Sequence, residues 1–490
     1  MKRKTLILLL SVCATFIILN CWAIAHEVFF VPLFSVALIV IYLAVFRFDL
    51  LLYLMAFVTP LSVPLSEFSE QAIDISLPTE PIMLIVTFLF FARSLYGIRS
   101  DSRFLKHPIT IVIYFYLFWL LITSITSTIP LVSFKFLATK IWFIVSCYFA
   151  LQQFFKDNNK NIIRIFGCYI AGLAIVVLMT TIRHAGYGFS EFSGRWVMSP
   201  YYNDHTAYGA ILAFFIPIVF GFAFLSDIKN RVRILYFVLT ALFLTALFLS
   251  FSRAAWLSLA VSIGVWCLLK WRIKLSWVAL AILVLGTAFY NFSDDIFYRM
   301  SRNSQDSSGD LGEHLQSITN ISTDASNVER LNRWAAAGDM IKEKPITGWG
   351  PGTYQFNYAP FQQGKYKTII TTNFGDGGNA HSEYIGPFAE TGILGFLSVL
   401  VLVIAIIYFG IKTYINAPDT QTRIMALSLI LALISYFVHG ILNNFLDTDK
   451  LALPYWATFA AVVTLAQKVK DNLSLEFTSK SKMLQITASS

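Results

Sequence analysis

Long apolar runs dominate the pattern of hydrophobic and polar positions along the chain. The runs are near 20 residues long and do not alternate between polar and apolar positions, which predicts membrane-spanning helices rather than barrel strands. We expect an all-α polytopic membrane protein with about twelve to fourteen transmembrane helices, in which the third and ninth segments are short enough to be half-spans. The predicted spans are residues 5–25, 28–46, 49–65, 81–97, 108–128, 135–155, 162–182, 206–226, 234–250, 254–270, 275–292, 388–411, 423–443 and 451–467.

One long polar segment, residues 293–386, interrupts this pattern. Within it, Leu331, Trp334 and Ile341 recur at helical spacing and predict one amphipathic helix that ends near Lys342. Pro345 follows the predicted helix and stops it.

Three glycines at positions 348, 350 and 352 follow Pro345 and supply backbone freedom for a tight turn. We therefore expect a large loop with short helices. The predicted regions are N-terminal transmembrane helices over 1–292, the loop over 293–386, C-terminal transmembrane helices over 387–467 and a tail over 468–490.

Composition and charge fix the class and the orientation. Hydrophobic residues make up 57% of the chain and charged residues 13%, whereas a soluble domain has roughly 25% charged residues. Of the 37 Lys and Arg residues, 23 lie in segments on the side of the N-terminus and 6 in the short segments on the opposite side. This bias places both termini in the cytoplasm and the large loop outside it. The net charge of +9 therefore reflects topology, and we expect no nucleic-acid partner.

The sequence gives no sign of a metal site or a cofactor site. All five cysteines, Cys13, Cys21, Cys147, Cys168 and Cys267, fall inside apolar runs, so we expect neither a disulfide framework nor a zinc site. The chain also lacks a phosphate-binding P-loop and a dinucleotide fingerprint.

Three arginines on the outward side are candidates for anion binding: Arg195, Arg253 and Arg330. Arg253 lies between two apolar runs, where a charge is costly and is by default a functional candidate. The alternatives are a snorkelling anchor or ion pair for Arg253, an interfacial cation for Arg195 and a solvated helix surface for Arg330. Arg333 is a weaker candidate. A guanidinium group forks onto phosphate oxygens, so several converging arginines would hold a diphosphate.

His381 is the best candidate for a general base, because it precedes an apolar run at the outward side and an imidazole accepts protons near neutral pH. Its alternative is a capping or hydrogen-bonding role. His205, beside Asp204, is a second option, and Glu383 either orients His381 or is a rim charge. The acidic turn 447–449 is interpreted as an ordinary polar turn, with binding of an acceptor sugar as the alternative.

Together these motifs resemble the O-antigen ligase superfamily. The resemblance rests on the stretch 251–256 around Arg253, the helix start at Arg330, the segment 345–352 and the stretch 380–384 around His381 with the glycines that follow it. It is densest over residues 195–410. Many members have Asn after the histidine, and this chain has Ser382.

The resemblance implies about a dozen spans, one periplasmic loop and transfer of a glycan from undecaprenyl diphosphate to a hydroxyl acceptor without a metal ion. By match of position it assigns His381 as the catalytic base and Arg195, Arg253 and Arg330 as diphosphate-binding residues. We expect a bacterial inner-membrane enzyme of lipopolysaccharide biosynthesis that is active at its periplasmic face, with a lipid-linked donor and a lipid A–core acceptor. The alternatives within this class are an O-antigen or exopolysaccharide polymerase and a protein O-oligosaccharyltransferase. A transporter of lipid-linked glycans is the rival from a different class.

Overall fold

The apolar runs form helices, as the sequence predicts. The computed structural model describes residues 3–26, 28, 30–67, 75–97, 101–273, 287, 325–363 and 378–489. In these ranges eight helices are long and apolar enough to cross a membrane, and three shorter apolar helices lie within residues 13–61. The only sheet there is a two-stranded antiparallel ribbon, in which β1 (Val63–Pro64) pairs with β2 (Ser76–Leu77). The chain is thus a polytopic all-α membrane protein, because its backbone hydrogen bonds are satisfied within helices.

The first part of the chain contributes nine helices to the described structure. Pro residues open α6 and α7, where the missing amide hydrogen is not needed. The bounds are α1 (Arg3–Ala25), α2 (Phe30–Phe46), α3 (Phe48–Val58), α4 (Thr79–Leu95), α5 (Ser102–Leu105), α6 (Pro108–Ile125), α7 (Pro130–Ile144), α8 (Leu151–Asp157) and α9 (Lys160–Gly186). A π-helical stretch, Val145–Ala150, joins α7 to α8, so the two cross as one span.

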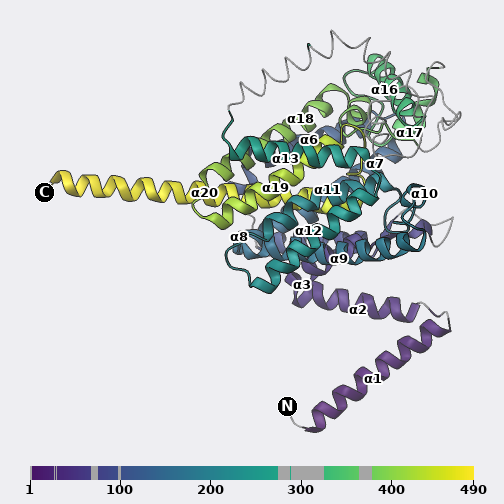
Figure 1. Ribbon diagram of the computed structural model, residues 1–490, viewed down its shortest axis with the longest axis horizontal. Helices are drawn as coiled ribbons and strands as arrows, with labels where there is room; N and C mark the ends of the chain where they lie inside the picture. The colour runs from purple at the N-terminus through teal and green to yellow at the C-terminus, as the bar shows by residue number, and fades with distance from the viewer. Residues whose placement is uncertain are drawn as a thin grey trace.

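The second part contains the helices that meet at the candidate site. The bounds are α10 (Glu191–Gly194), α11 (His205–Phe222), α12 (Asn230–Leu249), α13 (Arg253–Lys270), α16 (Ala325–Glu343), α17 (Tyr354–Asn357), α18 (Ile385–Asn416), α19 (Thr420–His439) and α20 (Asp449–Ser489). Helices α11 and α19 pack against each other in the middle of the bundle, α13 and α18 lie beside α19, and α6 packs against α18 (Figure 1). Both central helices bury most of their side chains.

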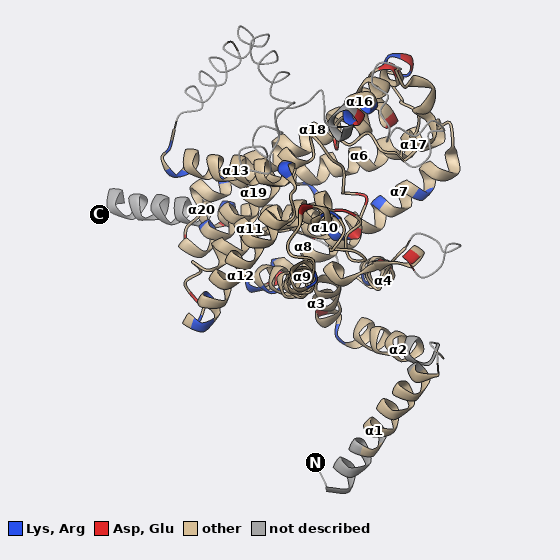
Figure 2. Cartoon of the chain, turned by 45° about the vertical axis from the view of Figure 1, so that its right-hand side comes forward, with Lys and Arg blue, Asp and Glu red and all other residues tan. Residues whose placement is uncertain are grey.

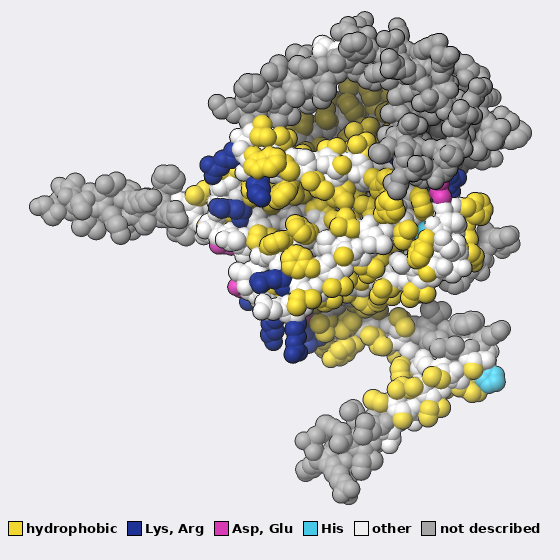
Figure 3. Space-filling view, viewed as in Figure 1, with side chains coloured by type: hydrophobic (Ala, Val, Ile, Leu, Met, Phe, Trp, Pro, Cys, Tyr) yellow, Lys and Arg dark blue, Asp and Glu magenta, His cyan; other side chains and the backbone are white. Residues whose placement is uncertain are grey.

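The two ends of the bundle differ in charge and in structure. Figure 2 shows Lys, Arg, Asp and Glu concentrated toward the ends of the helices, with few along their middles. In Figure 3, hydrophobic side chains cover the middle of the visible face, and Lys and Arg gather at the end from which α20 emerges. Helices α16 and α17 lie at the other end (Figure 1). This separation follows the charge bias that the sequence shows.

The predicted spans coincide with helices, with three differences. The third ends early, because α3 stops at Val58 and Pro60 begins a 3₁₀ turn. The ninth, short enough in the sequence to be a half-span, is long enough for a full span, because α12 runs for 20 residues. The helix that contains the last predicted span, α20, continues past residue 467 to Ser489. The predicted span 275–292 lies outside the described residues, apart from Thr287.

Candidate functional site

A turn with three glycines fixes the loop helix α16 to the membrane helices. Gly348, Gly350 and Gly352 all have positive φ, which the sequence anticipates and which L side chains rarely adopt. The backbone N–H of Gly350 donates to the carbonyl of Glu390 at 2.8 Å, and the N–H of Trp349 donates to that of Ala389 at 3.1 Å. These bonds dock the end of α16 onto the start of α18.

The same turn also binds the connection between α6 and α7. The N–H and hydroxyl of Thr128 both donate to the carbonyl of Trp349, at 3.0 and 2.8 Å. The hydroxyl of Ser133 donates to the carbonyl of Pro351 at 2.9 Å. As a result, the loop helix has a defined position relative to α7 and α18. The backbone that carries its arginines is therefore fixed in position.

Helix α16 carries two arginines with different surroundings. Arg333 is buried, and its Nε donates to Glu329 at 2.9 Å while its Nη1 donates to the carbonyl of Asn379 at 2.9 Å. Its guanidinium also lies over the ring of Tyr358. Arg333 therefore has a structural role, which agrees with its rank as the weaker candidate. Arg330 lies three residues earlier, about five sixths of a turn away, and is half-buried.

The loop that carries His381 is held on both sides. Before it, the indole of Trp334 donates to the carbonyl of Ala380 at 3.1 Å, and Arg333 holds Asn379 as described above. After it, the N–H of Glu383 donates to the carbonyl of Gly440 at 2.8 Å, and the hydroxyl of Tyr384 donates to the carbonyl of Phe437 at 3.0 Å. His381 is thus clamped between α16 and the end of α19.

His381 has an unusual backbone and a perturbed side chain. Its φ is +47°, in the left-handed region, and its N–H donates to Oδ1 of Asn379 at 3.0 Å. Burial lowers the pKa of His381 to about 4, and the positive charges of Arg333 and Arg330 add to this shift. Because the charged form is disfavoured, the imidazole is neutral at pH 7 and is able to accept a proton.

Electrostatic interactions connect the other predicted residues with this loop. Arg330 and Asp204 act on His381, and Arg330 acts with Arg195 on His205. Asp204 caps α11, since its Oδ1 accepts from the N–H groups of Thr206 and Ala207 at 2.7 and 2.8 Å. Charged groups on three elements therefore interact electrostatically: the start of α11, the loop helix and the His381 loop.

The segments that carry Arg195 and Arg253 pack against each other. A Cβ on Gly194 would lie 2.7 Å from the ring of Phe251, two residues before Arg253. Phe251 has φ +51°, which turns the chain sharply between α12 and α13 so that Arg253 begins the new helix. The guanidinium of Arg195 is 60% exposed and pairs with Glu191 at 2.9 Å. Arg195 thus lies at the exposed rim of the site, whereas Arg330 and His381 are more buried.

Glu383 does not orient His381. Its Oε1 instead accepts from the hydroxyl of Tyr436 at 2.5 Å and from the N–H groups of Phe445 and Leu446 at 2.8 and 3.0 Å. Burial raises the pKa of Glu383, and Asp447 adds to the shift. Glu383 therefore shapes the turn between α19 and α20.

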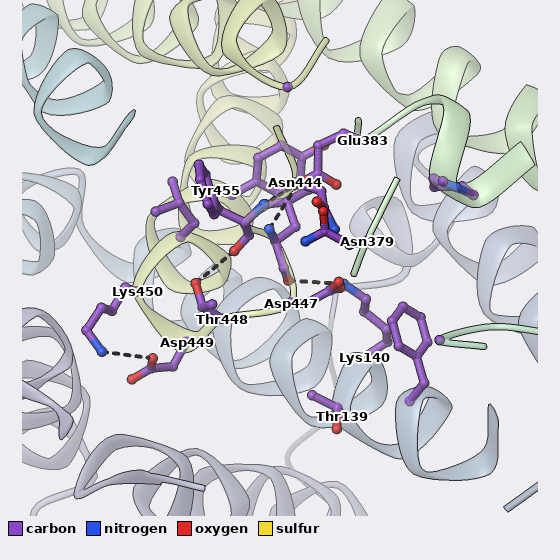
Figure 4. Close-up of a pocket in the computed structure, with 18 of the residues that line it drawn as sticks. Thr139, Lys140, Asn379, Glu383, Asn444, Asp447, Thr448, Asp449, Lys450 and Tyr455 are labelled. Atoms are coloured by element: carbon purple, nitrogen blue, oxygen red, sulfur yellow. Dashed lines mark hydrogen bonds and ion pairs between the residues drawn. The ribbon is translucent and has the colours of Figure 1, made fainter. Parts of the chain in front are cut away.

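A cavity of about 770 Å³ opens beside the His381 loop. Its wall contains Asn379, Ala380 and Ser382 from that loop, together with residues of α7 and of the turn between α19 and α20. Lys140 and Asp447 face each other there, with Nζ 2.7 Å from Oδ1 (Figure 4). Lys140 was not among the candidates chosen from the sequence. Because α7 starts at Pro130, Lys140 lies in the third turn of that helix. A lysine within an apolar helix was the signal that would have marked it.

The arrangement supports two chemical tasks. Guanidinium groups at the rim and on α16 offer positive charge and forked donors to a phosphorylated group. The neutral imidazole of His381, on which Arg333 and Arg330 act, is able to accept a proton. Nothing in this set requires a bound metal to supply the positive charge.

Comparison with known proteins confirms the predicted resemblance. Residues 238–400 match the family model described as O-Antigen ligase. An uncharacterized protein of Haemophilus influenzae is similar to this chain, with 24% identity over 259 residues. The match covers 52% of this chain, and the chain spans 62% of that protein's length. The matched family region runs from α12 into α18 and includes Arg253, Arg330 and His381, whereas Arg195 lies before it.

Proposed function

We infer from the O-antigen ligase match over residues 238–400 that this multi-pass membrane protein is a glycosyltransferase of the ligase and polymerase type. Such an enzyme takes a glycan from a lipid-linked donor and joins it to a glycan acceptor. The observation that supports the inference is the contact between the loop helix and the His381 loop, in which the indole of Trp334 in α16 donates to the carbonyl of Ala380 at 3.1 Å.

We propose undecaprenyl diphosphate as the carrier and a metal-independent, inverting transfer as the reaction. The acceptor hydroxyl oxygen bonds to the anomeric carbon, and the bond from that carbon to the diphosphate oxygen breaks. The diphosphate leaves with the bonding electron pair, and Arg195, Arg253 and Arg330 stabilise its charge. His381 accepts the proton of the attacking hydroxyl. Attack on the face opposite the leaving group gives inversion.

The proposed setting is the bacterial inner membrane, with the active end facing the periplasm. The charge bias supports this orientation, because the end opposite α16 carries most Lys and Arg residues. Ligation of O-antigen to lipid A–core is the leading reaction within the class. Polymerisation of lipid-linked repeats and transfer to a protein hydroxyl use the same chemistry and differ only in the acceptor.

An assay of the purified full chain in lipid nanodiscs tests the proposal. A lipid-linked glycan donor is offered with lipid A–core or with a second lipid-linked glycan, and the products are separated by mass. We expect transfer to lipid A–core, and a loss of at least about 100-fold in kcat for His381→Ala, as is typical for removal of a general base. Lys229→Gln, at the other end of the bundle, serves as the matched control.

The outcomes separate the candidates. Product only with the second lipid-linked glycan identifies a polymerase instead of a ligase. Movement of an unmodified lipid-linked glycan across the membrane, equally fast in His381→Ala and Arg253→Ala, indicates the transporter and ends the glycosyltransferase proposal.

A further inference from the structure

The cavity beside the His381 loop has the size and the location of a ligand site. Its volume of about 770 Å³ falls in the range of roughly 300–1,000 Å³ for small-molecule sites. Its wall comes from α7, the turn before α11, the α17 turn, the His381 loop and the start of α20. His381 and the arginines Arg195, Arg253 and Arg330 are not among the lining residues, so the cavity adjoins the proposed reaction site and is separate from it.

The lining of this cavity combines flat aromatic rings with planar hydrogen-bonding groups. Aromatic rings include Tyr201, Phe356 and Tyr384, and carboxamides include Asn203, Gln355 and Asn444. A sugar ring presents C–H groups on its faces and hydroxyl groups around its edge. Aromatic faces pack on the former, and amide and carboxylate groups bond the latter. The mixture is therefore suited to a saccharide rather than to an acyl chain, which would need a uniformly apolar wall.

Lys140 and Asp447 form the main polar contact in this wall. The side chain of Lys140 is 8% exposed, and its Nζ donates to Oδ1 of Asp447 at 2.7 Å and to the carbonyl of Leu446 at 3.0 Å. Asp447, by contrast, is 50% exposed. The lysine thus holds the carboxylate of Asp447 in a fixed position. In that position the carboxylate is able to accept hydrogen bonds from hydroxyl groups.

The charge of the wall restricts the kind of saccharide. Six acidic residues line the cavity, against three lysines: Glu80, Asp204, Glu383, Glu390, Asp447 and Asp449 against Lys135, Lys140 and Lys450. Asp447 and Asp449 pair with lysines and burial raises the pKa of Glu383, so the wall has no surplus of positive charge with which to bind a phosphorylated or carboxylated sugar. A neutral saccharide, or one with an amine, fits the wall better.

We propose that this cavity binds a neutral or amine-bearing saccharide, a segment of the acceptor glycan next to the reacting sugar, with Asp447, held by Lys140, as a specificity-determining residue. The assignment to the acceptor rests on the proposed function. In that function His381 takes a proton from the acceptor, and the residues on both sides of His381 line the cavity, while His381 and the arginines do not. The cavity is therefore placed to hold acceptor sugars beside the reacting one.

Binding of soluble oligosaccharides tests the site without any transfer reaction. Saturation-transfer NMR is recorded on the full chain in nanodiscs with a neutral oligosaccharide and with a matched carboxylated one. We expect signal from the neutral ligand, and a fall of about ten-fold in its affinity in Asp447→Asn, because one charged hydrogen bond is lost. Phe356→Ala changes an exposed lining ring and leaves every charge in place. It is expected to weaken binding as well, and Asp471→Asn, at the other end, is the matched control.

Two results would overturn the site: unchanged affinity in both Asp447→Asn and Phe356→Ala, or preference for the carboxylated ligand. Transfer kinetics then distinguish the source of the saccharide. A raised KM for the acceptor and an unchanged KM for the donor in Phe356→Ala support the acceptor assignment, and the reverse contradicts it. If the protein binds the neutral ligand but transfers nothing, the proposed function fails while the saccharide site stands.

Discussion

At His381, a left-handed backbone and a lowered side-chain pKa occur in the same residue. Residues held in a sparsely populated backbone region cost about 1–3 kcal/mol and occur often at functional sites. Here hydrogen bonds from α16 and α19 to the neighbouring residues offset that cost. The sequence identified His381 as a candidate, but not this backbone, since Ala380 and Ser382 give no signal for a turn.

The pKa of His381 leads to a prediction for the pH dependence of transfer. Since the folded pKa lies near 4, below the usual value of 6.5, the base stays neutral as the pH falls. We expect kcat/KM to stay constant down to about pH 5 and to decrease only below it. Arg330→Gln removes a charge that lowers this pKa, so its acidic limb should move toward higher pH. If kcat/KM of the protein without substitutions falls with a midpoint near pH 6.5, His381 with a lowered pKa is not the catalytic base.

Arg333 and Arg330 should respond differently to substitution. Arg333 and Glu329 are 10% and 6% exposed, and Arg333→Met removes the cation that neutralises a buried carboxylate. Such a change typically costs about 3–5 kcal/mol, so we expect a clear drop in thermal unfolding temperature in nanodiscs. Arg330→Met, on the same helix but half-buried, should reduce transfer with a much smaller drop. Equal destabilisation by both would remove the distinction between a structural and a substrate-binding arginine.

At the scale of elements, the three-glycine turn links the loop to the membrane helices. The sequence predicted a tight turn, because three glycines at alternate positions are hard to explain otherwise. It did not predict what the turn binds. Ser127 and Ser133, which lie against Gly350, are more than 200 positions away along the chain, and no local pattern encodes that contact.

Gly350→Ala tests the turn. A Cβ at this position would overlap the side chain of Ser127, and the φ of +115° disfavours any L side chain. We expect a loss of about 1–3 kcal/mol in stability, measured by thermal unfolding, with a parallel loss of transfer as α16 moves. Gly338→Ala is the control, because a Cβ there meets nothing within 4 Å and alanine favours a helix. A stable and active Gly350→Ala protein would show that the turn does not position α16.

At the scale of the whole molecule, the sequence predicts most helices, because a span needs about 20 apolar residues wherever it lies. Boundaries were less predictable where polar residues lie inside a helix, as Lys140 does in α7. The pairing of Lys140 with Asp447 joins α7 to the turn before α20. It was missed because the acidic turn 447–449 looks like any exposed polar turn until the fold places a lysine opposite it.

The orientation in the membrane is testable with introduced cysteines. Tyr187→Cys lies at the end of α9 near the candidate site, and Lys229→Cys lies at the opposite end before α12. In spheroplasts, an impermeant maleimide should label the first, and label the second only after permeabilisation. The parent protein gives the background from its own cysteines. Labelling in the reverse order would place the candidate site in the cytoplasm and end the proposed reaction with a periplasmic acceptor.

Helix α20 has a consequence for how the protein is handled. Its first turn supplies Asp449 and Lys450 to the cavity wall, and the same uninterrupted helix reaches Ser489, well beyond the opposite end of the bundle (Figure 1). At 1.5 Å per residue it is a rod of roughly 60 Å. A fusion tag or a soluble binding protein on the protruding half is therefore connected, through one continuous helix, to residues that line the cavity.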